Sequence, residues 1–238
     1  MSMTATSLPE STAADRGVPS SSRSANPGVP TRRVVLLHGI WMVGATMQWV
    51  GTRLRAAGFA TETFGYHSIV GGPDEAVPQL AEQLRDGGET DIVAHSLGGL
   101  VALQALAAEP GLPVRRVVCL GVPLCGSSAA SNLSRWPLAA LWLGRSAELL
   151  QNGCVAWPRG PEVGMIAGSL PHGLGGLLAS FEGDNDGSVS VEETRSPQLA
   201  DHVVVAASHS GLLFSAEAIA QTLAFLHAGR FEHPDQAA

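Results

Sequence analysis

The chain has 238 residues, 45% of them apolar and 15% charged, a balance typical of a globular protein with a largely buried sheet. Its net charge is -7, and its basic residues are dispersed arginines without a basic stripe, which argues against nucleic acid as a partner. No apolar run approaches the length of a transmembrane helix, since the longest candidate spans only residues 136–143.

The composition of the chain ends predicts where the domain begins and ends, and the cysteine count indicates the cellular compartment. Residues 1–30 are rich in Ser, Ala, Pro and Thr and lack the apolar region of a signal peptide, so we expect a disordered tail there. We expect one domain over 31–231 and a short tail over 232–238. The three cysteines are odd in number and lack paired metal-ligand spacing, which predicts free thiols in a reducing, cytoplasmic compartment.

In the first part of the domain, short apolar runs alternate with segments of helical periodicity. This alternation predicts a parallel sheet flanked by helices. The first buried strand is expected at 34–37, and a helix at about 46–57 is ended by Gly58. A second strand at 59–66 is followed by a helix at about 74–85, for which Asp74 is a candidate N-cap.

The second part of the domain continues the same succession. A strand at 90–94 precedes a helix that begins after Ser96. Further strands are expected at 114–120, 162–167 and 201–206, and a closing helix at about 215–227. These elements predict a minimal, mostly parallel six-stranded sheet with helices on both faces. An insertion at about 124–161 contains one amphipathic stretch, 133–150, and is expected to form a small cap.

The segment 94–99 (AHSLGG) places a serine between an apolar strand and a strong helix former. Small residues on both sides permit a tight turn that lifts the Ser96 hydroxyl out of the sheet, beside the N–H groups of the helix N-terminus. This pattern is typical of a nucleophile elbow, although Ala94 stands where glycine is usual. A serine that only caps a helix gives the same short match, so support is needed from elsewhere in the chain.

Three further polar segments follow predicted strands: 38–41 (HGIW), 184–189 (DNDGSV) and 208–210 (SHS). The carboxyl ends of parallel strands meet at one edge of a sheet, so these groups are expected near Ser96. A serine hydroxyl needs an imidazole to take its proton, and the imidazole needs a carboxylate to fix its tautomer. Alone, His209 is typical of a capping histidine and Asp186 of a turn residue. Their joint order, Ser, Asp, His, predicts a catalytic site.

In these segments the chain resembles the lipase-like α/β-hydrolases, including compact bacterial lipases and the GPI inositol-deacylase-like branch. The resemblance covers about 32–231 and rests on segments 34–40 (VVLLHGI), 94–99 (AHSLGG), 120–127 (LGVPLCGS), 186–189 (DGSV) and 208–211 (SHSG). It implies an α/β-hydrolase fold and an esterase or lipase that needs no cofactor. It assigns the nucleophile to Ser96, the acid to Asp186 and the base to His209, with the oxyanion hole formed by the Leu97 and Ile40 N–H groups.

The acid has an alternative, because Asp184 is also within reach of His209 by spacing. We prefer Asp186, because Gly187 permits a tight turn and Val189 begins a new buried run that anchors the loop.

Two residues are expected to line a substrate pocket. His95 occupies the variable position of the elbow, and Trp41 follows the oxyanion segment; packing is the alternative role for both. No metal is expected, because His172, His202 and Asp201 do not form a convincing set of ligands.

The sequence therefore predicts a serine hydrolase that cleaves small-molecule or lipid esters through an acyl-enzyme. Two other functions fit the same pattern. An acyltransferase would resolve the acyl-enzyme with an alcohol in place of water. A non-catalytic binding module would keep the fold without turnover, although all three residue types of the triad are present here.

Overall fold

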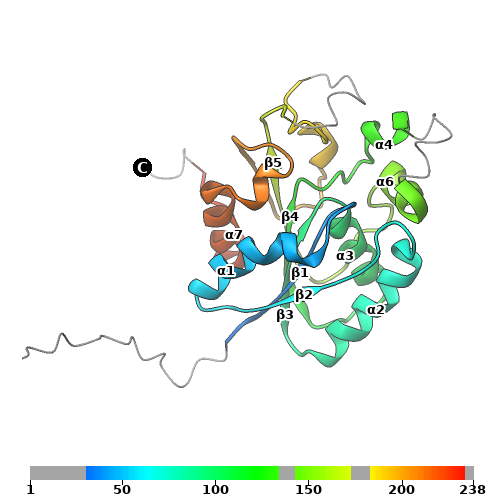
Figure 1. Ribbon diagram of the computed structural model, residues 1–238. Coiled ribbons are helices and arrows are strands. Elements are labelled where there is room, and N and C mark those ends of the chain that lie inside the picture. Colours follow the sequence, from blue (N-terminus) through cyan, green and yellow to red (C-terminus); the bar gives the residue numbers. More distant parts are fainter. Residues whose placement is uncertain (1–30, 134–142, 173–182, 234–238) are drawn as a thin grey trace, which may run out of the picture. The chain divides into compact units, whose positions relative to one another are not determined.

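The computed structural model describes residues 31–133, 143–172 and 183–233 (Figure 1). The predicted N-terminal tail, most of the C-terminal tail and residues 134–142 of the amphipathic stretch lie outside the described residues. From Thr31 onward the chain forms one compact unit.

A single sheet of six strands forms the centre of this unit. All neighbouring strands run parallel, in the order β2-β1-β3-β4-β5-β6. The strands are β1 (Arg33–Leu37), β2 (Ala60–Phe64), β3 (Thr90–His95), β4 (Val114–Leu120), β5 (Glu162–Gly168) and β6 (Asp201–Val205). Each lies within one or two residues of its predicted bounds, and the sheet predicted as mostly parallel is parallel at every one of these pairings.

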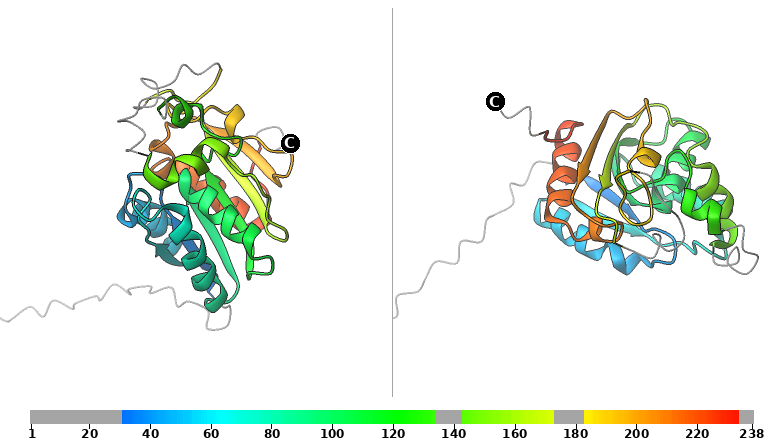
Figure 2. Two further views of the ribbon diagram at one scale, coloured as in Figure 1. Left: turned by 90° about the vertical axis from the view of Figure 1, so that its right-hand side faces the viewer. Right: turned by 90° about the horizontal axis from the view of Figure 1, so that it is seen from above.

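Helices cover both faces of the sheet (Figures 1 and 2). On one face lie α2 (Gly72–Asp86) and α3 (Leu97–Ala108); on the other lie α1 (Gln48–Ala56) and α7 (Ala216–Ala228). Short helices complete the described part of the insertion, namely α4 (Ser128–Leu133), η2 (Gly144–Ser146) and α6 (Ala147–Asn152). The chain also contains the 3-10 turns η1 (Gly44–Met47), η4 (Glu192–Thr194) and η5 (Gly211–Leu213).

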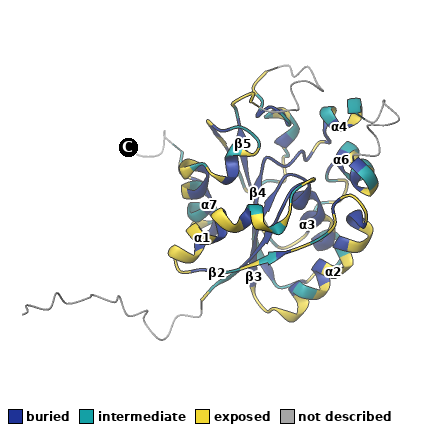
Figure 3. Cartoon of the chain, viewed as in Figure 1, coloured by how far each residue is buried: buried dark blue, intermediate teal, exposed yellow. Residues whose placement is uncertain are grey.

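Burial of the strands follows from this layering. Every residue of the central strand β3 is buried, whereas the edge strand β2 alternates between exposed and half-buried positions before Phe64 (Figure 3). A parallel strand covered on both faces has no solvent side, and the middle of β3, from Ile92 to Ala94, is accordingly apolar.

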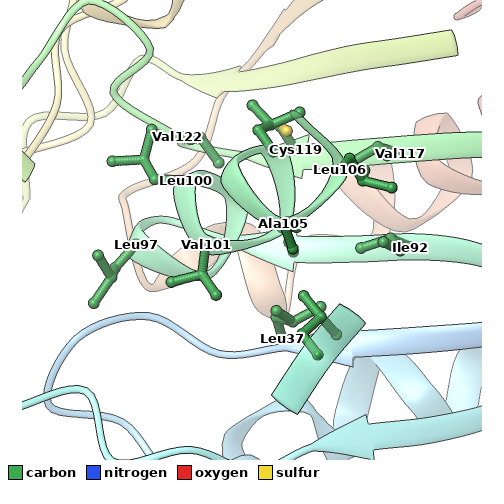
Figure 4. Close-up of a cluster of buried hydrophobic side chains, with 14 of the residues drawn as sticks. Leu37, Ile92, Leu97, Leu100, Val101, Ala105, Leu106, Val117, Cys119 and Val122 are labelled. Carbon is green, nitrogen blue, oxygen red and sulfur yellow. The ribbon is translucent and has the colours of Figure 1, made fainter. Parts of the chain in front are cut away.

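Helix α3 is buried along nearly its whole length, because the sheet lies on one side of it and α2 and α6 cover the other. Its apolar side chains pack against Leu37 of β1, Ile92 of β3 and Val117 of β4 (Figure 4). This packing fixes the N-terminus of α3 directly after Ser96, so the turn that carries this serine has a rigid support on both sides.

The start of α2 differs from the prediction. The helix begins at Gly72, and Asp74 lies in its first turn, so the prediction of Asp74 as N-cap is wrong. The Gly71 and Gly72 N–H groups both donate to the His67 carbonyl, and Gly72 has φ +61, a conformation open to glycine. In the first turn, the Asp74 carboxylate still interacts favourably with the helix dipole.

The state of the cysteines and the lengths of the helices bear on the predicted cytoplasmic location of the protein. Cys119, Cys125 and Cys154 are free thiols, as predicted, and Cys119 is buried in β4. Among the helices of residues 31–133, 143–172 and 183–233, none combines the length and apolar character needed to span a bilayer. The cytoplasmic location stays a prediction.

Candidate active site

Ser96 lies on a tight turn between β3 and α3. Its backbone angles are φ 52 and ψ -125. Among the described non-glycine residues, only Ser96 and one other residue have a positive φ. A side chain in such a conformation costs roughly 1–3 kcal/mol, which the surrounding structure must offset. The Ser96 N–H donates to the Leu120 carbonyl at 2.9 Å, and its own carbonyl accepts from Gly99 N–H at 2.9 Å.

Glycines after the serine allow this turn to approach its neighbours closely. A Cβ on Gly98 would lie 2.5 Å from the His38 carbonyl oxygen, and one on Gly99 would lie 2.3 Å from Val122. Both positions therefore require glycine. Ala94, before the turn, is buried in β3, and its small methyl group fits there. The elbow is thus packed directly against the loops that follow β1 and β4.

His209, in the loop after β6, and Asp186, which follows β5 in the chain, form a close pair beside Gly121 at the end of β4. His209 Nδ1 lies 2.7 Å from Asp186 Oδ2. In addition, the backbone N–H of His209 donates to the backbone carbonyl of Asp186 at 2.9 Å. Because a carboxylate only accepts, Nδ1 carries the proton and Nε2 is left as the basic nitrogen. Gly121, with φ +57, makes room for the pair: a Cβ there would lie 3.1 Å from each of these two atoms.

The second Asp186 oxygen is held by its own loop. Asp186 Oδ1 accepts from the Ser188 and Val189 N–H groups at 2.9 and 2.8 Å, and the side chain is buried. These bonds fix the carboxylate and leave Oδ2 for His209. Asp184 is exposed on the same loop. Of the two acids considered from the sequence, the structure therefore brings Asp186 to the histidine.

Ser96 and His209 line one pocket of about 390 Å³. Ile40 and Trp41 of the loop after β1 line it as well, as do Ser188 and Val189 of the acid loop. Pro123 and the insertion that follows it also line the pocket, and the insertion contributes Ser127 and the apolar side chains Ala129, Ala130, Leu133, Leu143 and Leu150. The described part of the expected cap thus forms a wall of this pocket.

The two predicted oxyanion donors lie on segments that meet at Ser96. Leu97 is the first residue of α3, so its N–H has no carbonyl partner within the helix. The loop after β1 passes over the serine: a Cβ on Gly39 would lie 3.1 Å from Ser96 Cβ. Ile40 follows this glycine and lines the pocket. Trp41 comes next with φ 57 and is 49% exposed at the pocket.

His95 also lines the pocket, but its nitrogens face protein. Its Nε2 lies 3.0 Å from the His209 carbonyl, to which it must donate, and the two rings are 4.7 Å apart. Nδ1 is buried without a partner among the described residues and faces Gly39. Burial, reinforced by the nearby His209, lowers the pKa of His95 to about 3, so the ring stays neutral. Its contacts favour support of the base over recognition of a substrate.

Tyr66, in the loop after β2, was not selected from the sequence. Its hydroxyl donates to the His38 carbonyl at 2.8 Å, and its ring stacks on the His38 imidazole at a centroid distance of 4.5 Å. No motif surrounds Tyr66. The signal lies in the register of the sheet, which pairs Leu37 of β1 with Phe64 of β2 and so places the two following loops side by side.

Of the residues considered as metal ligands, His202 and Asp201 have other side-chain partners, and His172 lines the pocket. His202 Nε2 lies 2.9 Å from the Thr194 hydroxyl, and Asp201 accepts from the Phe231 N–H and the His233 ring. Within the described ranges, no group of three or more His, Cys, Asp or Glu side chains is arranged to hold a metal ion.

Comparison with known proteins identifies the fold. No family model and no curated protein matches the sequence. Among solved structures, the lipase BlEst2 of Bacillus licheniformis in its mature form is 20% identical, with 86% of this chain and 94% of that chain covered and a TM-score of 0.70. The metagenomic carboxyl esterase MGS0156 is 19% identical over 79% of this chain and 68% of that chain, with a TM-score of 0.60.

A third match has a different activity in its name. Methylketone synthase I of tomato, solved with 2-tridecanone, is 12% identical over 83% of this chain and 98% of that chain, with a TM-score of 0.53. Together with the sheet order, these likenesses show that the chain has the α/β-hydrolase fold, as predicted. Because one fold supports several reactions, the function must be argued from the site.

Proposed function

We propose that the protein hydrolyses carboxylic esters, with Ser96 as nucleophile, His209 as general base and Asp186 as the acid that orients the imidazole. The observation that carries the proposal is the hydrogen-bonded pair of His209 and the buried Asp186, in the pocket that Ser96 lines from its strained turn. A neutral histidine protonated at Nδ1 has its basic Nε2 available, which is the form that a serine nucleophile requires.

The reaction follows from these groups. As Ser96 Oγ attacks the acyl carbon, its proton moves to His209 Nε2, and the carbonyl oxygen of the substrate becomes an oxyanion. The Leu97 and Ile40 N–H groups donate to this oxyanion. The intermediate then collapses, the ester C–O bond breaks, and His209 returns the proton to the leaving alcohol. A water molecule attacks the acyl-enzyme by the same route and releases the acid and the free serine.

Asp186 stabilises the charge that develops on His209. Its carboxylate is buried and already accepts two backbone N–H bonds on Oδ1, so it needs little reorganisation when the imidazole gains a proton. The direct contact of Oδ2 with Nδ1 also holds the ring in one orientation.

The shape of the pocket supports a substrate with an apolar acyl group. Most side chains that the insertion, Trp41 and Val189 contribute to the walls are apolar, with Ser127 as an exception, whereas Ser96 and His209 provide reactive polar atoms. A small number of polar groups in an apolar pocket is the usual arrangement for orienting a mainly apolar ligand. We therefore propose small-molecule or lipid esters as the substrate class.

A fluorophosphonate probe tests the nucleophile, since only an activated serine reacts with it readily. We expect labelling of the native protein, with the modified peptide mapped to Ser96, and no labelling of Ser96→Ala. Ser131→Ala is the matched control, because this serine is exposed on α4 and outside the pocket lining. Absence of labelling in the native protein would contradict the proposal and favour a binding module.

A panel of p-nitrophenyl esters from acetate to palmitate tests the reaction. We expect turnover that depends on chain length and disappears in Ser96→Ala. Adding an alcohol acceptor separates hydrolysis from acyl transfer: a free acid as the main product supports the hydrolase, whereas a new ester as the main product identifies an acyltransferase.

A further inference from the structure

The direction of the Ile40 N–H is set by the peptide group that joins Gly39 to Ile40. A trans peptide is planar, so its N–H points opposite to its C=O. The Gly39 carbonyl lies 2.8 Å from His38 Nδ1. Because a carbonyl only accepts, Nδ1 donates to it. The His38 side chain thus holds the carbonyl on its own side of the loop and turns the Ile40 N–H to the other side.

Tyr66 holds His38 in two ways. Its hydroxyl donates to the His38 carbonyl at 2.8 Å, and its ring stacks on the imidazole, with 4.5 Å between centroids and 12° between planes. On β2, Phe64 extends the stack, with its centroid 5.8 Å from that of Tyr66. The imidazole is therefore fixed by a column of rings that begins in the sheet.

Protonation of the two rings suits these bonds. Burial is the main cause that lowers the pKa of His38. The ring is therefore neutral and carries a single N–H. Burial also raises the pKa of Tyr66, so its hydroxyl keeps the proton that it donates.

On its other side, the same loop rests on the elbow. The His38 carbonyl packs against Gly98, where a Cβ would lie 2.5 Å from the oxygen, and Gly39 packs against Ser96 and His95. A displacement of the His38 carbonyl therefore shifts Ile40 relative to Ser96. Tyr66 is the side chain that donates to this carbonyl.

We propose that Tyr66 is a positioning residue for the oxyanion hole, acting through His38 to aim the Ile40 N–H at the carbonyl oxygen bound above Ser96. This inference rests on the proposed function, because it assigns Ile40 to the oxyanion hole. A donor aimed in advance at developing charge lowers the barrier, whereas one that must turn during the reaction contributes less.

Kinetics of Tyr66→Phe separates this role from plain packing, because the substitution keeps the ring and removes only the hydroxyl. We expect kcat to fall about 10-fold with KM nearly unchanged, a fraction of the 10²–10³-fold effect typical of losing an oxyanion donor. Affinity for a boronic acid inhibitor should fall by a similar factor, because the boron adduct places an oxygen in the hole.

Thr222→Val is the matched control. This buried hydroxyl on α7 donates to the Ala218 carbonyl at 2.7 Å and is outside the pocket lining, so its removal should lower stability without changing kcat. If Tyr66→Phe lowers the melting temperature as Thr222→Val does but leaves kcat and boronic acid affinity at native values, the proposal is overturned.

Variants of His38 test the intermediate step. Asparagine can place an N–H close to the position of Nδ1, whereas leucine cannot. We expect His38→Asn to retain at least about 10-fold more kcat than His38→Leu, by analogy with the loss of one oxyanion donor. Equal activity of the two variants would contradict the role of the Nδ1–H bond.

A readout without turnover separates failure of this inference from failure of the proposed function. In proton NMR, the buried His38 Nδ1–H should give a downfield signal that His38→Leu removes. Tyr66→Phe should speed its exchange with water at least several-fold. If the native protein cleaves no ester, the proposed function fails. If the exchange rate is unchanged in Tyr66→Phe, the positioning role fails on its own.

Discussion

The loops that carry the acid and the oxyanion donor are held in different ways. The acid loop is held mainly by its own residues. Asp186 Oδ1 accepts from the Ser188 and Val189 N–H groups, and Asn185 forms an isolated β-bridge with Ser190. The loop after β1 depends on Tyr66 of a neighbouring loop, on the glycines of the elbow and on its own His38.

This difference has a consequence for catalysis. A loop closed by its own backbone keeps its shape when distant side chains change, whereas a loop held by tertiary contacts loses precision when any one of them is removed. We therefore expect the acid and base to tolerate changes around β2 and the oxyanion donor to be sensitive to them.

Asp186→Asn should have the largest effect. The asparagine oxygen can still accept the Ser188 and Val189 N–H bonds, so the loop should keep its shape. Its amide nitrogen would then face His209 Nδ1 and favour the wrong tautomer, and kcat should fall about 10⁴-fold, as in serine proteases.

Asp184→Asn is the control for this prediction, since Asp184 is exposed on the same loop. Its kcat for a p-nitrophenyl ester should stay within about two-fold of the native value, as is usual for exposed positions. A larger loss for Asp184→Asn than for Asp186→Asn would move the acid to residue 184.

Gly39→Ala should act mainly on the oxyanion loop. The new Cβ would lie 2.9 Å from His95 Nδ1 and 3.1 Å from Ser96 Cβ, so the loop must move away from the serine. We expect kcat to fall about 10²-fold, the size of one lost oxyanion donor. The pH dependence of kcat/KM should keep its shape, because the new methyl group does not touch the hydrogen-bonded His209–Asp186 pair. A changed pH profile would show that the two loops are not independent.

His95 connects the base to the elbow, and two substitutions sharpen the comparison there. Glutamine can place an N–H near the position of Nε2 and keep the bond to the His209 carbonyl, whereas phenylalanine keeps only the ring. We expect His95→Phe to lower kcat about 10-fold more than His95→Gln, because the backbone that carries the base then loses the side chain that holds its carbonyl. Equal kcat values would assign His95 to packing alone.

The sequence predicted the parts of the site that depend on local chemistry. Ser96 follows from small residues between an apolar strand and a helix, and the turn at Gly187 favoured Asp186 over Asp184. Most of the inner strands were predicted from short apolar runs, which are typical of parallel strands covered on both faces. What these parts share is that each is specified within a few residues of itself.

The supporting contacts were not predictable in this way. Tyr66 reaches His38 only because β1 and β2 pair in the register that joins Leu37 to Phe64. The bond from His95 to the His209 carbonyl likewise joins segments 114 residues apart in the chain. At α2, the His67 carbonyl accepts from two N–H groups, and the helix begins before Asp74. A capping rule that considers one residue at a time does not predict this start.

Stability at low pH should show the smallest effect. Burial is the main cause that lowers the pKa of His202 to about 4, and His95 is lowered further, to about 3. Both have a reference pKa of 6.5, so below this pH the unfolded chain binds protons that the folded chain does not. Their contribution to stability is therefore complete above pH 6.5 and is lost as the pH falls toward 4.

His202→Gln tests this sign, because the glutamine amide does not titrate and can keep a hydrogen bond to Thr194. In urea unfolding between pH 6.5 and 4, the native protein should lose at most about 1.4 kcal/mol more per pH unit than the variant. His227→Gln, on the last turn of α7, is the control. Parallel curves for the native protein and His202→Gln would mean that His202 takes up its proton in the folded state as readily as in the unfolded chain, which would contradict the lowered pKa.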